Sequence, residues 1–92
     1  MARNAGTYVL VIPPHFEKIL ASLKRKKQSM MRDLIAEIER VMKNPGMGKP
    51  LRNVLRNYRR VHMGSFVLIY EIVKNEVRLL DFDHHDRIYK KY

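Results

Sequence analysis

The sequence predicts an α+β fold in which an N-terminal helical hairpin packs on an antiparallel-rich sheet, in the order β-α-α-β-β-β(-β). Three observations predict it. An apolar run at residues 8–12 stops at two prolines, the apolar positions of residues 16–42 recur with a helical period, and from residue 60 the period falls to two. Ninety-two residues suit one hydrophobic core, so residues 1–92 are expected to form a single domain.

The first strand is expected at residues 8–12, where the sequence YVLVI is rich in β-branched and aromatic side chains. Because every one of these side chains is apolar, we expect the strand to be buried on both faces or nearly so. Pro13 and Pro14 end it, since proline donates no hydrogen bond to a strand ladder.

Two helices are expected next. The first begins at His15, carries apolar residues at i, i+3, i+4 and i+7, and ends at the basic residues 24–27, where the helix dipole favours cations. The second has Ser29 as its expected N-cap, one apolar face, and a stop at Asn44 and Pro45. A connector of about four residues predicts an antiparallel helical hairpin.

The remainder of the chain is predicted to form strands. After a turn-rich loop at residues 44–50, Arg60 and His62 alternate with apolar neighbours. Residues 66–73 and 76–82 predict two further strands joined by a tight turn at Lys74 and Asn75. The simplest arrangement is a β-meander with both helices on one face.

Charge and composition limit the possible functions. Nineteen Lys and Arg against nine Asp and Glu give a formal net charge of +10, which predicts a polyanionic partner. Nucleic acid is favoured, while an anionic membrane surface or an acidic protein stays open. The absence of cysteine excludes disulfides and thiol chemistry and favours the cytoplasm, and no apolar run reaches the length of about 20 residues that a membrane span needs.

The first candidate site is a cluster of cations with no acidic residue among them: Lys49, Arg52, Arg56, Arg59, Arg60 and His62. On a strand, Arg60 and His62 project to the same side and can bracket a phosphate. The alternative is a solvated sheet edge whose charges only oppose aggregation.

The second candidate site is the tail at residues 83–92, DHHDRIYKKY. Histidine can take and give protons near neutral pH, arginine can stabilise charge on phosphate oxygens, and tyrosine can stack on a base or act as a base. The candidate residues are His84, His85, Arg87 and Tyr89, with Lys90 and Lys91 as nucleic-acid contacts.

Other interpretations compete for the same residues. A metal site is not expected, because two adjacent histidines on a strand point to opposite faces. Asp81 and Asp83 can be paired catalytic carboxylates, but we expect them to hold Arg60 or Arg78 instead. Tyr89 and Tyr92 can cap the core, and residues 24–27 can be a solvated tip or a nucleic-acid contact.

Two stretches resemble the RelE/ParE toxin superfamily: KPLRNVLRNYRRVHMGSFVLIYEI at residues 49–72 and HHDRIY at residues 84–89. The resemblance implies a RelE-like fold and a type II toxin that cuts mRNA in the ribosomal A site. It also implies neutralisation by an acidic RelB-like antitoxin and attack of the 2′-hydroxyl on the phosphate without metal or cofactor.

Carried over by position, Arg60 and His62 match the family's basic pair facing the message, and Tyr89 matches its C-terminal tyrosine. His84 or His85 falls near the basic residue that assists phosphoryl chemistry. The chain departs from the family at Val67, where an arginine is usual. Loss of one such donor typically costs about 3 kcal/mol of transition-state stabilisation. Compensation by other residues, a weak or inactive enzyme, and a ParE-like toxin of gyrase all stay open, although His84, His85 and Tyr89 favour RelE.

Overall fold

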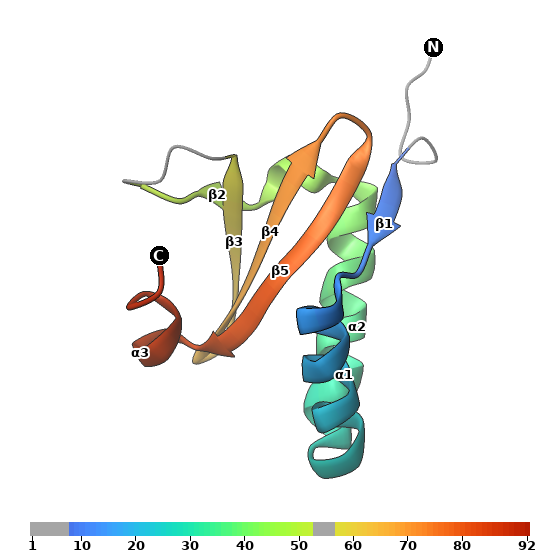
Figure 1. The fold of residues 1–92 in the computed structure, drawn as a ribbon, viewed down its shortest axis with the longest axis vertical. Helices are drawn as coiled ribbons and strands as arrows, with labels where there is room; N and C mark the ends of the chain where they lie inside the picture. The colour runs from blue at the N-terminus through green and yellow to red at the C-terminus, as the bar shows by residue number, and fades with distance from the viewer. Residues whose placement is uncertain (1–7, 53–56) are drawn as a thin grey trace.

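A five-stranded sheet separates two helical layers (Figure 1). The computed structural model describes residues 8–52 and 57–92. The elements are β1 (Val9–Val11), α1 (Pro14–Lys26), α2 (Gln28–Lys43), a 3₁₀ turn (Pro45–Met47), β2 (Lys49–Pro50), β3 (Tyr58–Met63), β4 (Phe66–Val73), β5 (Glu76–His84) and α3 (His85–Ile88). The predicted α+β class and element order are confirmed.

The sheet has the order β1-β5-β4-β3-β2. Strands β3, β4 and β5 form the predicted antiparallel meander, and β1 adds to it in parallel beside β5. Lys74 occupies the β4–β5 turn with a φ of 56°, the left-handed conformation that such tight turns require.

The predicted burial of the first strand was wrong. Strand β1 is only three residues long and lies at the sheet edge, where Val9 and Leu10 remain 51% and 37% exposed. Its pairing with β5 covers one side, and the other side has no strand among the described residues. Apolar composition alone does not distinguish such an edge strand from a central one.

The two helices follow the predicted periodicity closely. Phe16 of α1 and Leu34, Ile38 and Val41 of α2 are buried against the sheet. The connector, however, is the single residue Lys27, whose N–H donates to the carbonyl of Leu23. The predicted Ser29 cap was therefore wrong, because α2 begins one residue earlier, at Gln28, without a side-chain cap.

The sheet is apolar on both faces. The larger cluster packs α1 and α2 against Leu68, Tyr70 and Leu79. On the opposite face a second cluster holds Leu51, Val67, Ile69 and Ile88, and Ile88 comes from α3. The short C-terminal helix is thus anchored on this second face by one fully buried side chain, Ile88.

A bulge in β5 decides which residues reach that second face. Val77 and Leu79 face the helical hairpin, so simple alternation would place Asp81 there as well. The β4–β5 register shifts between Ile69 and Tyr70, so that Asp81 pairs with Ile69 on the α3 face. A bulge adds one residue to a strand and so reverses the faces of those that follow.

Among the helices of residues 8–52 and 57–92, none has both the length and the apolar character needed to cross a membrane.

We predict that Ile88→Ala lowers the free energy of unfolding by about 2–5 kcal/mol, because it leaves a cavity between α3 and the sheet. Ile35→Ala is the matched control, since Ile35 is 43% exposed on α2, and its cost is expected to stay near or below about 0.5 kcal/mol. Urea denaturation followed by circular dichroism measures both. Equal losses in the two variants would show that Ile88 does not anchor α3.

Candidate functional site

The candidate site lies on the α3 face of the sheet. Two cross-strand rows of β3, β4 and β5 face α3: His62, Val67 and Asp83 in one row, and Arg60, Ile69 and Asp81 in the next. Residues two apart on a strand share a face, which explains why Arg60 and His62 lie on the same side. The fully buried Val67 and Ile69 form the apolar floor of this face.

Three residues predicted from distant segments meet here. The hydroxyl of Tyr89 lies 3.2 Å from Nε2 of His62, within hydrogen-bond distance. The guanidinium carbon of Arg60 lies 5.8 Å from the centroid of the Tyr89 ring, a cation–π distance. Nε of Arg60 is buried and, among the described residues, has no hydrogen-bond partner. The group combines a hydrogen-bonded histidine and tyrosine with an arginine whose guanidinium lies against the tyrosine ring.

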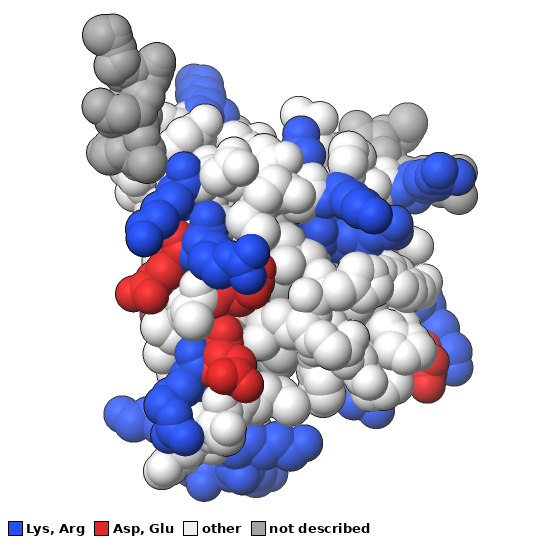
Figure 2. Space-filling view, turned by 180° about the vertical axis from the view of Figure 1, so that it is seen from behind, with Lys and Arg blue, Asp and Glu red and all other residues white. Residues whose placement is uncertain are grey.

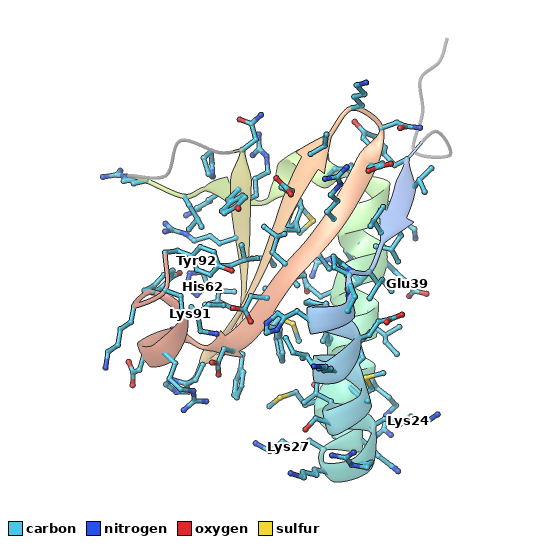
Figure 3. All side chains as sticks on the ribbon, in the orientation of Figure 1. Lys24, Lys27, Glu39, His62, Lys91 and Tyr92 are labelled. Atoms are coloured by element: carbon cyan, nitrogen blue, oxygen red, sulfur yellow. The ribbon has the colours of Figure 1, made fainter. Side chains whose placement is uncertain are left out.

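The tail that carries Tyr89 is held by two carboxylates of β5. Asp81, whose side chain is 5% exposed, accepts a hydrogen bond from Nζ of Lys91 at 2.9 Å and contacts the Tyr92 hydroxyl at 3.5 Å. Asp83 pairs with Arg87 at 2.9 Å and with Lys91 at 3.6 Å. Figure 3 shows His62, Lys91 and Tyr92 gathered beside α3.

The predicted partners of these two acids were therefore wrong. Asp81 and Asp83 hold the C-terminal tail instead of Arg60 or Arg78, and Arg78 pairs with Glu76 at 2.8 Å. The role of Asp81 as an anchor of the tail was not predicted from the sequence. The signal available for it was an acidic residue inside the otherwise apolar stretch LLDF at residues 79–82.

Burial, hydrogen bonds and nearby charges shift the pKa values of several groups in the tail. Burial alone would raise the pKa of Asp83, but the hydrogen bonds from Arg87 and from the His84 amide, with the charges of Arg87 and Lys91, lower it overall. The hydrogen bond to Asp81 raises the pKa of Lys91. Burial, and next the negative charge of Asp81, raise the pKa of Tyr92 to about 12. Tyr92 is thus a protonated structural phenol at neutral pH.

His84 and His85 lie apart from the His62–Tyr89 pair. His84 shares a cross-strand row with Phe66 and packs edge-on against its ring at 5.6 Å, on the face of the helical hairpin. His85 begins α3 and stacks on His84 at 4.5 Å. In the described structure neither imidazole ring contacts His62 or the Tyr89 side chain, and the one hydrogen bond between these residues runs from the Tyr89 amide to the His85 carbonyl. The premise that these histidines point to opposite faces was wrong, because the strand ends between them.

The predicted nucleic-acid contacts have different environments. Arg59 donates to the carbonyls of Gly48 at 2.6 Å and Gly46 at 3.4 Å, so it fixes the loop before β2. Lys91 is engaged by Asp81, whereas Lys49, Arg52 and Lys90 are exposed. Arg56 lies outside the described residues.

The hairpin tip carries a separate group of cations. Lys24 and Lys27 lie at the tip of the hairpin (Figure 3), where the Lys27 ammonium is 5.9 Å from the centroid of the Phe66 ring. Seen from behind, basic side chains gather at this end and again on the side of β2 (Figure 2). The charge of the molecule is therefore spread over several surfaces instead of one.

Comparison with known proteins identifies relatives over nearly the whole chain. Residues 10–89 match the family described as the ParE toxin of the type II toxin–antitoxin system parDE. A Methanocaldococcus jannaschii protein whose name assigns it to the RelE toxins, RelE4, is 38% identical over 87 residues, covering 91% of this chain and 93% of its own.

Two further relatives are more distant or shorter in extent. A Methanosarcina mazei protein without a functional name is 31% identical over 85 residues, covering 89% of this chain and 99% of its own. Toxin ParE1 of Caulobacter vibrioides is 44% identical over 41 residues, covering 45% of this chain and 43% of its own.

The lowered pKa of Asp83 predicts an acid-sensitive tail. In the unfolded chain the carboxyl of Asp83 has a pKa of about 3.9. The pairing of Asp83 therefore stabilises the fold above that pH, and this stabilisation is lost as the pH falls through the lower pKa of the folded state. We expect Asp83→Asn to lower the Tm at neutral pH and to reduce the loss of Tm on acidification below about pH 5. Thermal melts across this range measure it.

Glu39→Gln is the matched control for the loss of a carboxylate, because Glu39 is exposed on α2. It is expected to keep the wild-type dependence of Tm on pH. Parallel curves for wild type and Asp83→Asn would contradict the assigned role of Asp83.

Proposed function

The chain belongs to the ParE toxin family of type II toxin–antitoxin systems, within the RelE/ParE superfamily, and we propose that it acts as a ribosome-dependent mRNA endonuclease of the RelE type. The observation that carries the proposal is the hydrogen bond between Tyr89 and His62 beside Arg60, whose Nε has no partner among the described residues. These groups supply a proton acceptor and a charge stabiliser on one exposed face.

In the proposed reaction, the 2′-hydroxyl of one nucleotide attacks the adjacent phosphorus. The O2′–P bond forms and the P–O5′ bond breaks, which leaves a cyclic phosphate and a 5′-hydroxyl. The His62–Tyr89 pair accepts the 2′ proton, since its two atoms lie 3.2 Å apart and can exchange a proton. A water or the same pair returns a proton to the leaving oxygen.

Arg60 takes the electrostatic role in this scheme. Val67, at the position of the usual family arginine, is fully buried in the cluster that holds Ile88 and offers no donor to a phosphate. Arg60 lies one row away on the same face. Its guanidinium can stabilise the charge that develops on the phosphate oxygens. The scheme uses no metal or cofactor, and the ribosome supplies the positioning of mRNA in its A site.

The proposed partner is an acidic RelB-like antitoxin in the cytoplasm. A chain of formal charge +10 attracts an acidic, partly disordered segment that folds as it docks. Exposed cations such as Lys49, Arg52 and Lys90 are available to it. The product of the adjacent reading frame is the first candidate, and it is expected to be short and acidic.

We predict that Tyr89→Phe, His62→Gln and Arg60→Met each reduce mRNA cleavage on programmed ribosomes by about 10²-fold or more. Tyr89→Phe keeps the ring and removes only the hydroxyl. Primer extension on the mRNA recovered after the reaction measures the cuts. Lys24→Ala, at the hairpin tip, is the control for loss of one charge. Undiminished cutting by Tyr89→Phe and His62→Gln together would refute the assigned proton-transfer pair.

A ParE-like action on gyrase is the second candidate, favoured by the 44% identity with toxin ParE1 over 41 residues. It predicts growth arrest with DNA-damage signalling and no cuts at codon boundaries. Under this alternative the Tyr89→Phe and His62→Gln proteins remain toxic, because proton transfer has no part in poisoning. A survey of mRNA 5′ ends after induction, together with a DNA-damage reporter, separates the two.

A further inference from the structure

We propose that His84, His85 and Asp86 form a binding site for a divalent transition-metal ion, with Zn²⁺ as the best match, where β5 meets α3. Each residue offers one ligand atom, an imidazole nitrogen or a carboxylate oxygen, and these atoms all lie within 4.8 Å of one another. The site is separate from the His62–Tyr89 pair, because His84 packs on the other face of the sheet.

The backbone brings the two imidazoles together. His84 ends β5 with an extended backbone (φ −61°, ψ 143°), and His85 begins a helix. Their rings stack at 4.5 Å with an interplanar angle of 28°. The pair is supported from both sides, since the Phe66 ring packs on His84 and the His85 N–H donates to the carbonyl of Ser65 at 2.8 Å.

Among the described residues, the carboxylate of this cluster has no Lys or Arg within ion-pair distance, although the charge of the neighbouring Arg87 acts on it. Asp81 and Asp83 pair with Lys91 and Arg87, but in the described part of the chain Asp86 forms ion contacts within 4 Å only with histidines. Oδ1 of Asp86 lies 3.0 Å from Nδ1 of His85, and Oδ2 lies 3.6 Å from Nδ1 of His84. When both imidazoles are neutral, the negative charge has two nitrogen ligands beside it and no Lys or Arg in contact. A dication fits this arrangement.

The donor set selects the class of metal. Two imidazoles and one carboxylate suit Zn²⁺, Ni²⁺, Cu²⁺ or Co²⁺, whereas Mg²⁺ and Ca²⁺ prefer oxygen ligands alone. Zinc bonds of about 2.0–2.2 Å require the ligand atoms to draw together. The side chains of His85 and Asp86, 46% and 71% exposed, have room to rotate. A fourth position stays open to water.

Binding would tie the end of β5 to the first turn of α3. His84 Nδ1 now accepts a hydrogen bond from the Asp86 amide at 3.1 Å and so caps α3. A metal bound at this nitrogen replaces that cap with a stronger link. We therefore expect the metal to raise the Tm of the protein, since the folded tail holds the three ligands together and binds the ion more tightly than the unfolded chain does.

The test is a titration of tag-free, EDTA-stripped protein with ZnCl₂ in a calorimeter at about pH 7.5, because metal ligands bind in their deprotonated form. We expect one ion per chain. Asp86→Asn should weaken binding by at least about tenfold, and His85→Ala should abolish it. His15→Ala is the matched control, because His15 is an exposed histidine beside a different aspartate, Asp81. It should leave the affinity unchanged.

NMR of the wild type makes the result independent of how the variants fold. Zinc should shift the ring resonances of His84 and His85 and leave those of His15 and His62 in place. Cobalt should give the absorption spectrum of a low-coordinate nitrogen and oxygen site. The proposal is overturned by absence of binding, by unchanged binding in Asp86→Asn and His85→Ala, or by shifts confined to His15 or His62. A nuclease-dead Tyr89→Phe protein should bind zinc normally, so the two proposals fail separately.

Discussion

The buried carboxylate of Asp81 fixes the path of the C-terminal tail. A charge removed from water is costly unless a partner of opposite charge and hydrogen bonds replace the solvent. Lys91 provides that partner at 2.9 Å, and Tyr92 covers the same carboxylate. Because Lys91 is only two residues beyond Tyr89, this pairing limits where Tyr89 can lie. Ile88, which directly precedes Tyr89 and is buried on the apolar floor, fixes the same short segment from its N-terminal side.

Val67 and Ile88 show how the site and the packing constrain each other. Both side chains are fully buried in one cluster, so α3 docks on the position where the family pattern has an arginine. A guanidinium at that place would have to displace α3 or lie buried next to Asp83, its neighbour in the cross-strand row. A valine at position 67 is therefore compatible with the close packing of α3 on the sheet, whereas an arginine is not. In the proposed reaction, the same packing that removes a donor from β4 brings Tyr89 to His62.

The periodic parts of this fold could be predicted from the sequence, and its irregular junctions could not. Spacing of apolar residues located both helices and the meander to within a few residues, because burial of one face dictates that spacing. The convergence of Arg60, His62 and Tyr89 followed partly from strand alternation. Alternation failed at the β5 bulge, which moves Asp81 to the α3 face, and at the strand–helix junction, which stacks His84 on His85. Neither feature leaves a periodic signal, and the partner of Asp81 lies ten positions away on a different element.

The formal charge of +10 overstates the cations that are available to a substrate. Several are engaged by acceptors within the chain: Arg59 by Gly48, Arg78 by Glu76, Arg87 by Asp83 and Lys91 by Asp81. The exposed lysines of the hairpin tip lie on the hairpin side of the sheet, where Lys27 packs over Phe66, and they contribute to the long-range field that attracts a polyanion. In the proposed reaction, recognition of the phosphate at close range is assigned to the guanidinium of Arg60 beside Tyr89. The overall positive charge of the protein and the number of cations at the candidate site are thus separate properties. In the proposed reaction, a variant that lowers the overall positive charge without changing Arg60 slows the encounter with a polyanion, whereas loss of Arg60 acts after the encounter, on the phosphate itself.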